Sequence, residues 1–194
     1  MGSNPISSAI GDGHRTIRCP SSFLDDHGRA YGRAMSYPEP AYDGDGTASA
    51  TLRPAGAEPD LVYPSGVRVH HLALGSQTRS EFGLYRWDFS AQRTGPDPHF
   101  HRTISESFFV LSGTVSLYDG RRWRDAHPGD YLFVPEGGIH GFRNESGAEA
   151  SMLLLFAPGA PREEYFDRLA HLAQQPFDEG EREEFMRRHD TYWV

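Results

Sequence analysis

Cysteine is almost absent from this chain, which has a single one, Cys19, among 194 residues. One thiol allows no internal disulfide and offers no thiolate cluster for zinc. Apolar runs are short as well, and none approaches the roughly 20 residues needed to cross a bilayer. The first residues also lack the basic and then apolar pattern of a secretory signal. We therefore expect a cytoplasmic protein with no membrane partner.

Positive charge is also scarce. Lys and Arg number 19 against 27 Asp and Glu, which gives a net charge of −8. A nucleic-acid surface needs concentrated positive charge to displace counterions, so we expect no nucleic-acid partner. Hydrophobic residues make up 37% of the chain, enough for a globular domain with a substantial core.

The chain divides by composition into four parts. Residues 1–34 are rich in Gly, Ser, Asp and Arg and have no apolar period, so we expect a disordered extension. Met35 opens a second flexible stretch, so we expect the 34 residues before it to be either a misassigned upstream start or an added extension. Residues 35–64 are then an N-terminal arm, 65–158 a β-rich domain and 159–194 a helical segment.

Short runs of β-branched, aromatic and apolar residues, bounded by turn formers, predict about nine strands. The expected strands include Val67–Leu74, Phe82–Ser90, Ser107–Ser112, Thr114–Tyr118, Arg121–Arg124, Tyr131–Val134, His140–Asn144 and Ser151–Ala157. Asp119-Gly120 predicts a type I′ hairpin turn, which needs positive φ at both positions. Many short strands separated by Gly and Pro indicate a sandwich or barrel.

Two helices are expected after the strands. Pro161 opens the first, and acidic residues in its first turn favour the positive end of the helix dipole. The second spans about Glu181–Arg188. Their apolar stripes predict helices laid against the exterior of the barrel.

The chemistry is concentrated in His99-Phe100-His101, Glu106 and His140. Residues i and i+2 of a strand point to the same face, so His99 and His101 present two imidazoles into one space. Glu106 lies an odd number of residues further on, and a bend over 102–105 must bring it to the same interior. A lone buried histidine is more often a structural residue than a ligand. Three imidazoles and a carboxylate in an apolar pocket, however, are costly to bury unless a cation compensates them. Nitrogen and oxygen ligands without sulfur suit manganese, iron, cobalt, nickel, copper or zinc.

Two motifs carry a family resemblance. The first is HFHRTISESFFVLSG, with His99, His101, Glu106 and Gly113, and the second is GDYLFVPEGGIHGFRN. The fixed positions of the second are Gly129, Pro135, Gly137, His140 and Asn144. Over residues 65–158 the chain resembles the cupin superfamily, with one departure, because Arg93 stands where a glycine usually precedes the first histidine and Gly95 is nearby.

The resemblance implies an all-β, double-stranded β-helix (jelly-roll) cupin barrel with short C-terminal helices. It also implies one divalent transition metal ion held by His99, His101, Glu106 and His140. Pro135 and Gly137 would make the corner that directs His140 inward, and Asn144 would be a local hydrogen-bonding residue.

Likeness to quercetinase-type single-domain cupins implies a metal-dependent dioxygenase that acts on a small aromatic or enolic compound. Dioxygen would be its second substrate and Glu106 a catalytic base. The candidate pocket residues are Phe108, Tyr118, Tyr131, Phe133 and Phe142, although a core role suits each of them as well. Tyr85 and Trp87 are equally open.

Two other functions share the same ligand set. One is a non-redox isomerase, cyclase or dehydratase that uses the ion as a Lewis acid, and the other is a protein that only binds a small molecule.

Exposed sheet edges and apolar helix faces also predict a homodimer.

Overall fold

The computed structural model describes residues 23–24, 30–31, 37–47, 49–172 and 176–194. These belong to two units, residues 1–50 and 51–194. The extension expected over residues 1–34 lies largely outside the described residues. Within it, β1 (Phe23–Leu24) pairs with β2 (Ala30–Tyr31) in antiparallel fashion. No described helix has the length and apolarity that crossing a bilayer requires.

Strict alternation of buried and partly buried side chains shapes the central strands β5 (Gly83–Phe89) and β12 (Ala150–Ala157) of the second unit. In both strands every second residue is buried, which is the pattern of a sheet with one face against a core. The strand β7 (Ser105–Ser112) follows the same rule and buries Phe108 and Val110. Glu106 lies on this inner face, as the sequence predicted.

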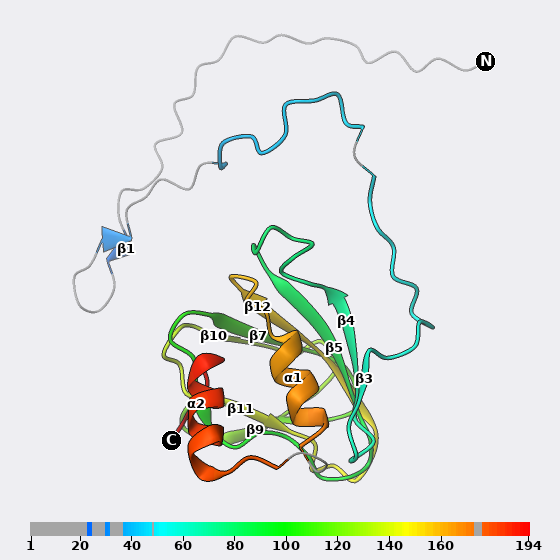
Figure 1. Ribbon diagram of the computed structural model, residues 1–194, viewed down its shortest axis with the longest axis vertical. Helices are drawn as coiled ribbons and strands as arrows, with labels where there is room; N and C mark the ends of the chain where they lie inside the picture. The colour runs from blue at the N-terminus through cyan, green and yellow to red at the C-terminus, as the bar shows by residue number, and fades with distance from the viewer. Residues whose placement is uncertain (1–22, 25–29, 32–36, 48, 173–175) are drawn as a thin grey trace. The chain divides into compact units, whose positions relative to one another are not determined.

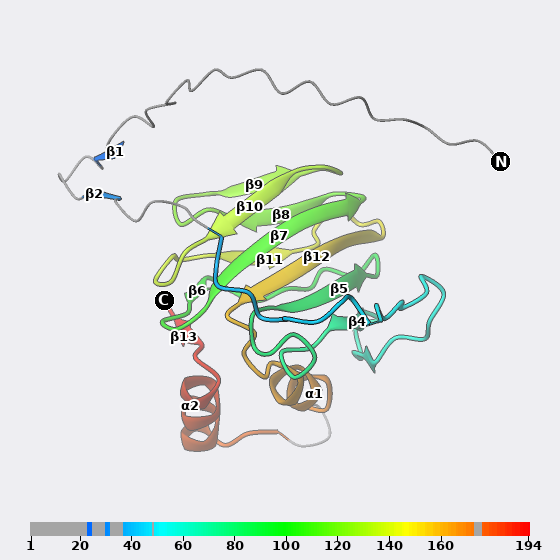
Figure 2. The same cartoon turned by 90° about the horizontal axis from the view of Figure 1, so that it is seen from above.

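Two antiparallel sheets enclose the core. The larger has the order β10-β7-β12-β5-β4-β3, and the smaller has the order β11-β8-β9 (Figure 2). Their remaining strands are β3 (Leu61–Val62), β4 (Arg68–Ala73), β8 (Val115–Tyr118), β9 (Trp123–Ala126), β10 (Tyr131–Val134) and β11 (Gly141–Arg143). The predicted all-β jelly roll is thus confirmed. The sheet begins before residue 65, because Leu61 pairs with Val69 inside the segment expected to be an arm.

The hairpin between β8 and β9 has a longer turn than predicted. Tyr118 pairs with Trp123, so four residues form the loop, and of its described residues only Gly120 has a positive φ, 84°. The two-residue type I′ turn is therefore wrong. The Asp119 carboxylate accepts hydrogen bonds from the amides of Arg121 and Arg122, and these bonds stabilise the wider loop.

The sequence predicted that the two helices lie against the barrel exterior, and this prediction is wrong for α1 (Glu163–Ala170) and α2 (Glu179–Arg188). Phe166 of α1 packs 5.2 Å from Trp87 and 5.3 Å from Tyr85 between ring centroids, and both partners face inward on β5. Figure 1 shows α1 in front of the space between the two sheets. The helices therefore close one end of the barrel.

Candidate metal centre

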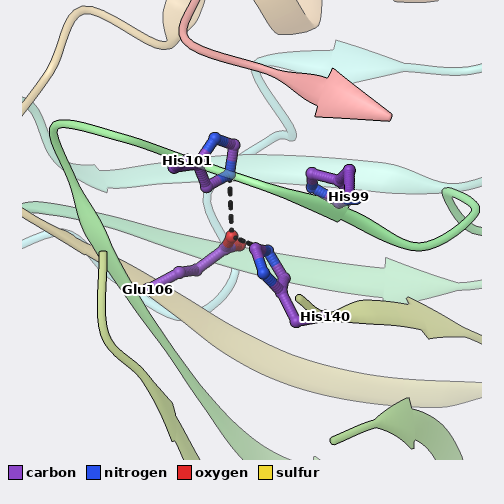
Figure 3. Close-up of side chains that lie close together, drawn as sticks. All are labelled: His99, His101, Glu106 and His140. Carbon is purple, nitrogen blue, oxygen red and sulfur yellow. Dashed lines mark hydrogen bonds and ion pairs between the residues drawn. The ribbon is translucent and has the colours of Figure 1, made fainter. Parts of the chain in front are cut away.

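Four predicted ligands meet at one place inside the barrel. His99 lies on β6 (His99–Phe100), His101 follows it, Glu106 lies on β7 and His140 precedes β11. All four are at most 5% exposed, and their ligand atoms lie within 4.8 Å of one another (Figure 3).

The backbone places these residues. His99 and His140 exchange two hydrogen bonds, with N···O distances of 2.9 and 2.8 Å, so two ligands form one cross-strand pair. The predicted bend after His101 lies between β6 and β7. On β7, Glu106 then pairs with Val134 of β10 on one side and with Phe156 of β12 on the other. At the corner after Pro135, Gly137 adopts a φ of 81° and donates its amide hydrogen to the carbonyl of His101, at 2.7 Å.

Backbone carbonyls orient all three imidazoles. The Nδ1 atoms of His99 and His140 lie 2.9 Å from the carbonyl oxygens of Asp97 and Gly138, and Nδ1 of His101 lies 2.5 Å from that of Asp190. A carbonyl can only accept, so each Nδ1 carries the hydrogen and each neutral ring keeps a lone pair on Nε2. This is the outer-shell arrangement that metal-bound histidines use.

When the imidazoles are neutral, the atoms that face one another in the cluster are the Nε2 atoms and the Glu106 oxygens. All of them can only accept hydrogen bonds. Nε2 of His140 lies 2.8 Å from Oε2 of Glu106, and Nε2 of His101 lies 3.3 Å from the same oxygen. Nε2 of His101 is buried and has no hydrogen-bond partner in the described part of the chain. Converging lone pairs around a buried carboxylate are satisfied by a cation. Two ligands on opposite sides of a transition metal are about 4.2 Å apart, so the cluster has suitable dimensions. The four residues therefore fit a divalent transition metal.

The protonation of the metal-free site follows from burial and from Glu106. Burial lowers the pKa of His99 to about 3, so this ring is neutral at pH 7. Burial opposes the charged forms of His140 and Glu106 too, but their mutual contact prevails. It raises the pKa of His140 and, together with His101, lowers the pKa of Glu106. The contact with Glu106 thus favours the protonated form of His140 in the metal-free protein.

A cavity of about 270 Å³ opens beside this cluster, and His99 and Glu106 line its inner end. Most of its wall is apolar. The aromatic lining residues include Trp87, Phe142, Phe156, Tyr165, Phe166 and Trp193. Gly95 also lines it, pressed against the backbone of Phe142, where an added Cβ would lie 2.0 Å from a carbonyl oxygen.

The five predicted pocket residues lie in different environments in the structure. Phe142 lines the cavity, and Phe108 packs behind His140 with ring centroids 5.9 Å apart. Tyr118 packs at a tilt against Trp123, with ring centroids 5.4 Å apart, and does not line the cavity. Tyr131 and Phe133 are wrong as pocket residues, because β10 turns them outward, 61% and 56% exposed. Trp87 lines the cavity, whereas Tyr85 lies in the core.

Sequence reasoning missed three residues near the site, namely Arg162, Asp190 and Trp193. Trp193 belongs to β13 (Tyr192–Trp193), which pairs with β6 and brings its ring 5.2 Å from His99. Arg162 precedes α1 and lines the cavity. A capping box of Asp178 and Glu181 was a visible signal for the start of α2, but the pairing of the chain end with β6 had none.

Asn144 has the local role that was expected. Its side chain is fully buried, and Nδ2 donates to the carbonyls of Ser90 and Ala148. Its Oδ1 accepts from the amide of Ser146. These bonds join the end of β5 to the loop after β11.

Comparisons with known proteins agree with this fold. Residues 85–156 match the cupin domain family. An uncharacterized protein of Aquifex aeolicus is 37% identical over 67 residues, which are 34% of this chain and 54% of that protein. The match thus spans about half of the relative's length.

Solved structures with the same fold include a predicted oxalate decarboxylase from Thermotoga maritima. It has a TM-score of 0.50 and 16% identity, over 56% of this chain and 99% of that one. KdgF from a Halomonas species has a TM-score of 0.49 and 17% identity, over 57% of this chain and 94% of that one. At these identities the likeness concerns the fold alone.

Proposed function

We propose that this chain, whose residues 85–156 match the cupin domain family, is a metal-dependent enzyme acting on a small aromatic or enolic compound, with dioxygenase chemistry as the first candidate. The observation that carries this proposal is the juxtaposition of a buried His₃Glu cluster and an aromatic cavity that meet at His99 and Glu106.

Each part of the site has a separate task. A bound divalent metal would supply Lewis acidity and, if redox-active, electron transfer to dioxygen. The aromatic walls exclude water and hold a planar ligand. Glu106 is ionised, so its carboxylate oxygen is in the correct state to accept the proton of a substrate hydroxyl.

The composition of the cavity wall favours an oxygenase over an isomerase or dehydratase. Among the described residues that line it, His99 and Glu106 are the only imidazole and carboxylate, and both belong to the cluster. The Tyr63 hydroxyl donates to the carbonyl of Phe166, at 3.0 Å. Burial raises the pKa of Tyr165, so that hydroxyl is a poor acid. Lewis-acid isomerisations and dehydrations need a placed acid and base, whereas dioxygen supplies its own reactive atoms.

The size of the cavity restricts the substrate. A volume of about 270 Å³ is at the lower end of the range for ligand pockets, roughly 300–1,000 Å³. Single-ring phenols, catechols and β-diketones therefore fit the proposal better than a flavonol with three rings.

The test is an oxygen electrode with protein loaded separately with iron, manganese, cobalt or nickel and a panel of catechols, phenols, β-diketones and flavonols. Zinc-loaded protein is the redox-inactive control. We expect oxygen uptake with a single-ring or enolic compound and none with zinc. Anaerobic isomerisation or dehydration without oxygen uptake by any form would replace this proposal with the Lewis-acid alternative.

A substitution separates the proposed role of Glu106 as a base from its role as a ligand. In Glu106→Gln an amide oxygen can still ligate weakly but cannot accept a proton, so turnover should fall more than metal content. Equal losses of both would leave Glu106 as a ligand alone.

A further inference from the structure

Arg162 is a buried arginine inside the proposed substrate cavity. It is 4% exposed, it lines the cavity together with His99 and Glu106, and it precedes α1. Arginine is rarely buried so completely without an anionic partner. Within the described part of the chain no carboxylate forms an ion pair with it.

The surroundings hold this guanidinium in place without a carboxylate in direct contact among the described residues. One nitrogen, Nη1, donates to the carbonyl of His189 and lies 3.4 Å from the hydroxyl of Thr191. The guanidinium carbon lies 4.0 Å from the ring centroid of Tyr165, so an aromatic face supports one side. Nε is buried and has no hydrogen-bond partner among the described residues. The described protein thus leaves part of the hydrogen-bonding capacity of this buried guanidinium unused.

The charges along the cavity point in the same direction. Its lining residues include one carboxylate, Glu106, and two guanidinium groups, Arg162 and the exposed Arg182. The lining tyrosines Tyr63 and Tyr165 stay neutral because burial raises the pKa of each. A divalent metal held by the cluster would add further positive charge. Such a cavity favours an anionic ligand.

We propose that Arg162 binds a carboxylate group of the substrate, so that the cavity accepts a small aromatic carboxylate with its other end toward the metal cluster. The guanidinium has the planar fork that matches two carboxylate oxygens. The substrate class rests on the proposed function, but the selectivity for a carboxylate is a property of binding alone. Arg162 is then a specificity-determining residue.

Binding measurements with matched ligands test this proposal on the full chain. Zinc-loaded protein, which cannot turn over oxygen, is titrated with phenylacetate, 4-hydroxyphenylacetate and their amides by calorimetry. In each pair the ring is the same and only the anionic group differs. We expect the carboxylates to bind roughly 10- to 100-fold more tightly, the effect of one charge-assisted hydrogen bond.

Variants locate the source of that preference. Arg162→Met should lose it while the affinity for the amides changes little. Arg168→Met on the same helix, whose guanidinium lies 4.1 Å from the Phe177 ring and does not line the cavity, should retain it. If Arg162→Met does not fold, Arg162→Lys keeps a positive charge without the fork and should retain only part of the preference.

Two results would overturn the inference. One is equal binding of carboxylates and amides by the wild type, and the other is a full preference in Arg162→Met, which would assign the carboxylate to the metal. The proposed function can fail separately. Carboxylate selectivity without oxygen uptake in any redox-active form would contradict the oxygenase proposal and leave the role of Arg162 intact. Oxygen uptake with neutral phenols and no carboxylate selectivity would do the reverse.

Discussion

Replacement of Asp190 should weaken a metal site that its side chain does not touch. Its carboxylate accepts hydrogen bonds from the amide of Arg102, at 3.0 and 3.1 Å, and from the amide and hydroxyl of Thr103, at 2.8 and 2.7 Å. Its own carbonyl accepts the Nδ1 hydrogen of His101. One residue near the end of the chain therefore fixes both the bend after the metal strand and the orientation of a ligand.

The expected loss for Asp190→Ala has two parts. Hydrogen bonds to a charged acceptor contribute about 1.5–3 kcal/mol each, and partial exposure reduces the two amide bonds to about 2 kcal/mol in total. Asp190 has a φ of 52°, and alanine in this left-handed region costs about 1 kcal/mol more. We therefore expect a loss of about 3 kcal/mol in the free energy of unfolding. Asp190→Asn tolerates the backbone and keeps an acceptor, so it should lose about 1 kcal/mol.

Metal affinity is the decisive measurement. Loss of an outer-shell partner typically lowers metal affinity 10- to 100-fold, and we expect this range for Asp190→Ala in competition with a chromophoric chelator. Asp130→Ala is the matched control, because that carboxylate also accepts from a backbone amide, of His127 at 2.7 Å, in a turn outside the ligand cluster. The control should lose stability and keep its metal affinity. An Asp190→Ala protein that is destabilised but binds metal as tightly as the wild type would refute the coupling.

Three further predictions concern the metal and the assembly. His101→Ala should remove most bound metal and lower the melting temperature, whereas the exposed His127→Ala should do neither; equal metal content by elemental analysis in all three proteins would contradict this. Lowering the pH should weaken metal binding, because the pKa of His140 is raised in the metal-free protein and its protonated ring cannot ligate. Metal affinity should be at its maximum at pH values above this raised pKa. It should begin to fall at a pH above about 6.5, the ordinary pKa of histidine. A constant affinity from pH 8 to 5.5 by chelator competition would exclude competition by protons. The homodimer was predicted from sheet edges and helix faces, and we now propose that the exposed aromatic face of β7 and β10 takes part in it. Phe109→Glu with Phe133→Glu should then shift light scattering from twice 21.7 kDa to 21.7 kDa, while a monomeric wild type would rule the dimer out.

The ligand set was predictable because its signals are local. His99 and His101 share a face as neighbours two apart, and the bend that returns Glu106 to that face lies within the next few residues. The third histidine follows a corner marked by Pro135 and Gly137. Each step needed only strand periodicity and turn chemistry, which a sequence displays directly.

The pocket was less predictable because β10 has no alternation of polar and apolar residues that would show which of its side chains face the core. Tyr131, Leu132, Phe133 and Val134 are all apolar or aromatic, so either alternate pair could face the core. In the structure Val134 is 6% exposed and pairs with Glu106, which turns the aromatic pair outward. Bulk alone had suggested the opposite choice. The partnership of His101 and Asp190 spans 89 residues, and no local pattern reports a contact at that separation.

The division between the family match and the rest of the chain has a consequence for substrate choice. Residues 85–156 contain all four members of the cluster, so the cluster lies wholly within the range that matches the cupin domain family. Arg162, Tyr165 and the acceptor for His101 lie beyond that range, in the segment that closes the barrel. The barrel therefore supplies the cluster and part of the aromatic wall, including Trp87 and Phe142, and the C-terminal segment adds Arg162, Tyr165 and Trp193. If the proposed role of Arg162 is correct, substitutions in residues 159–194 should change ligand selectivity without changing the four residues of the cluster.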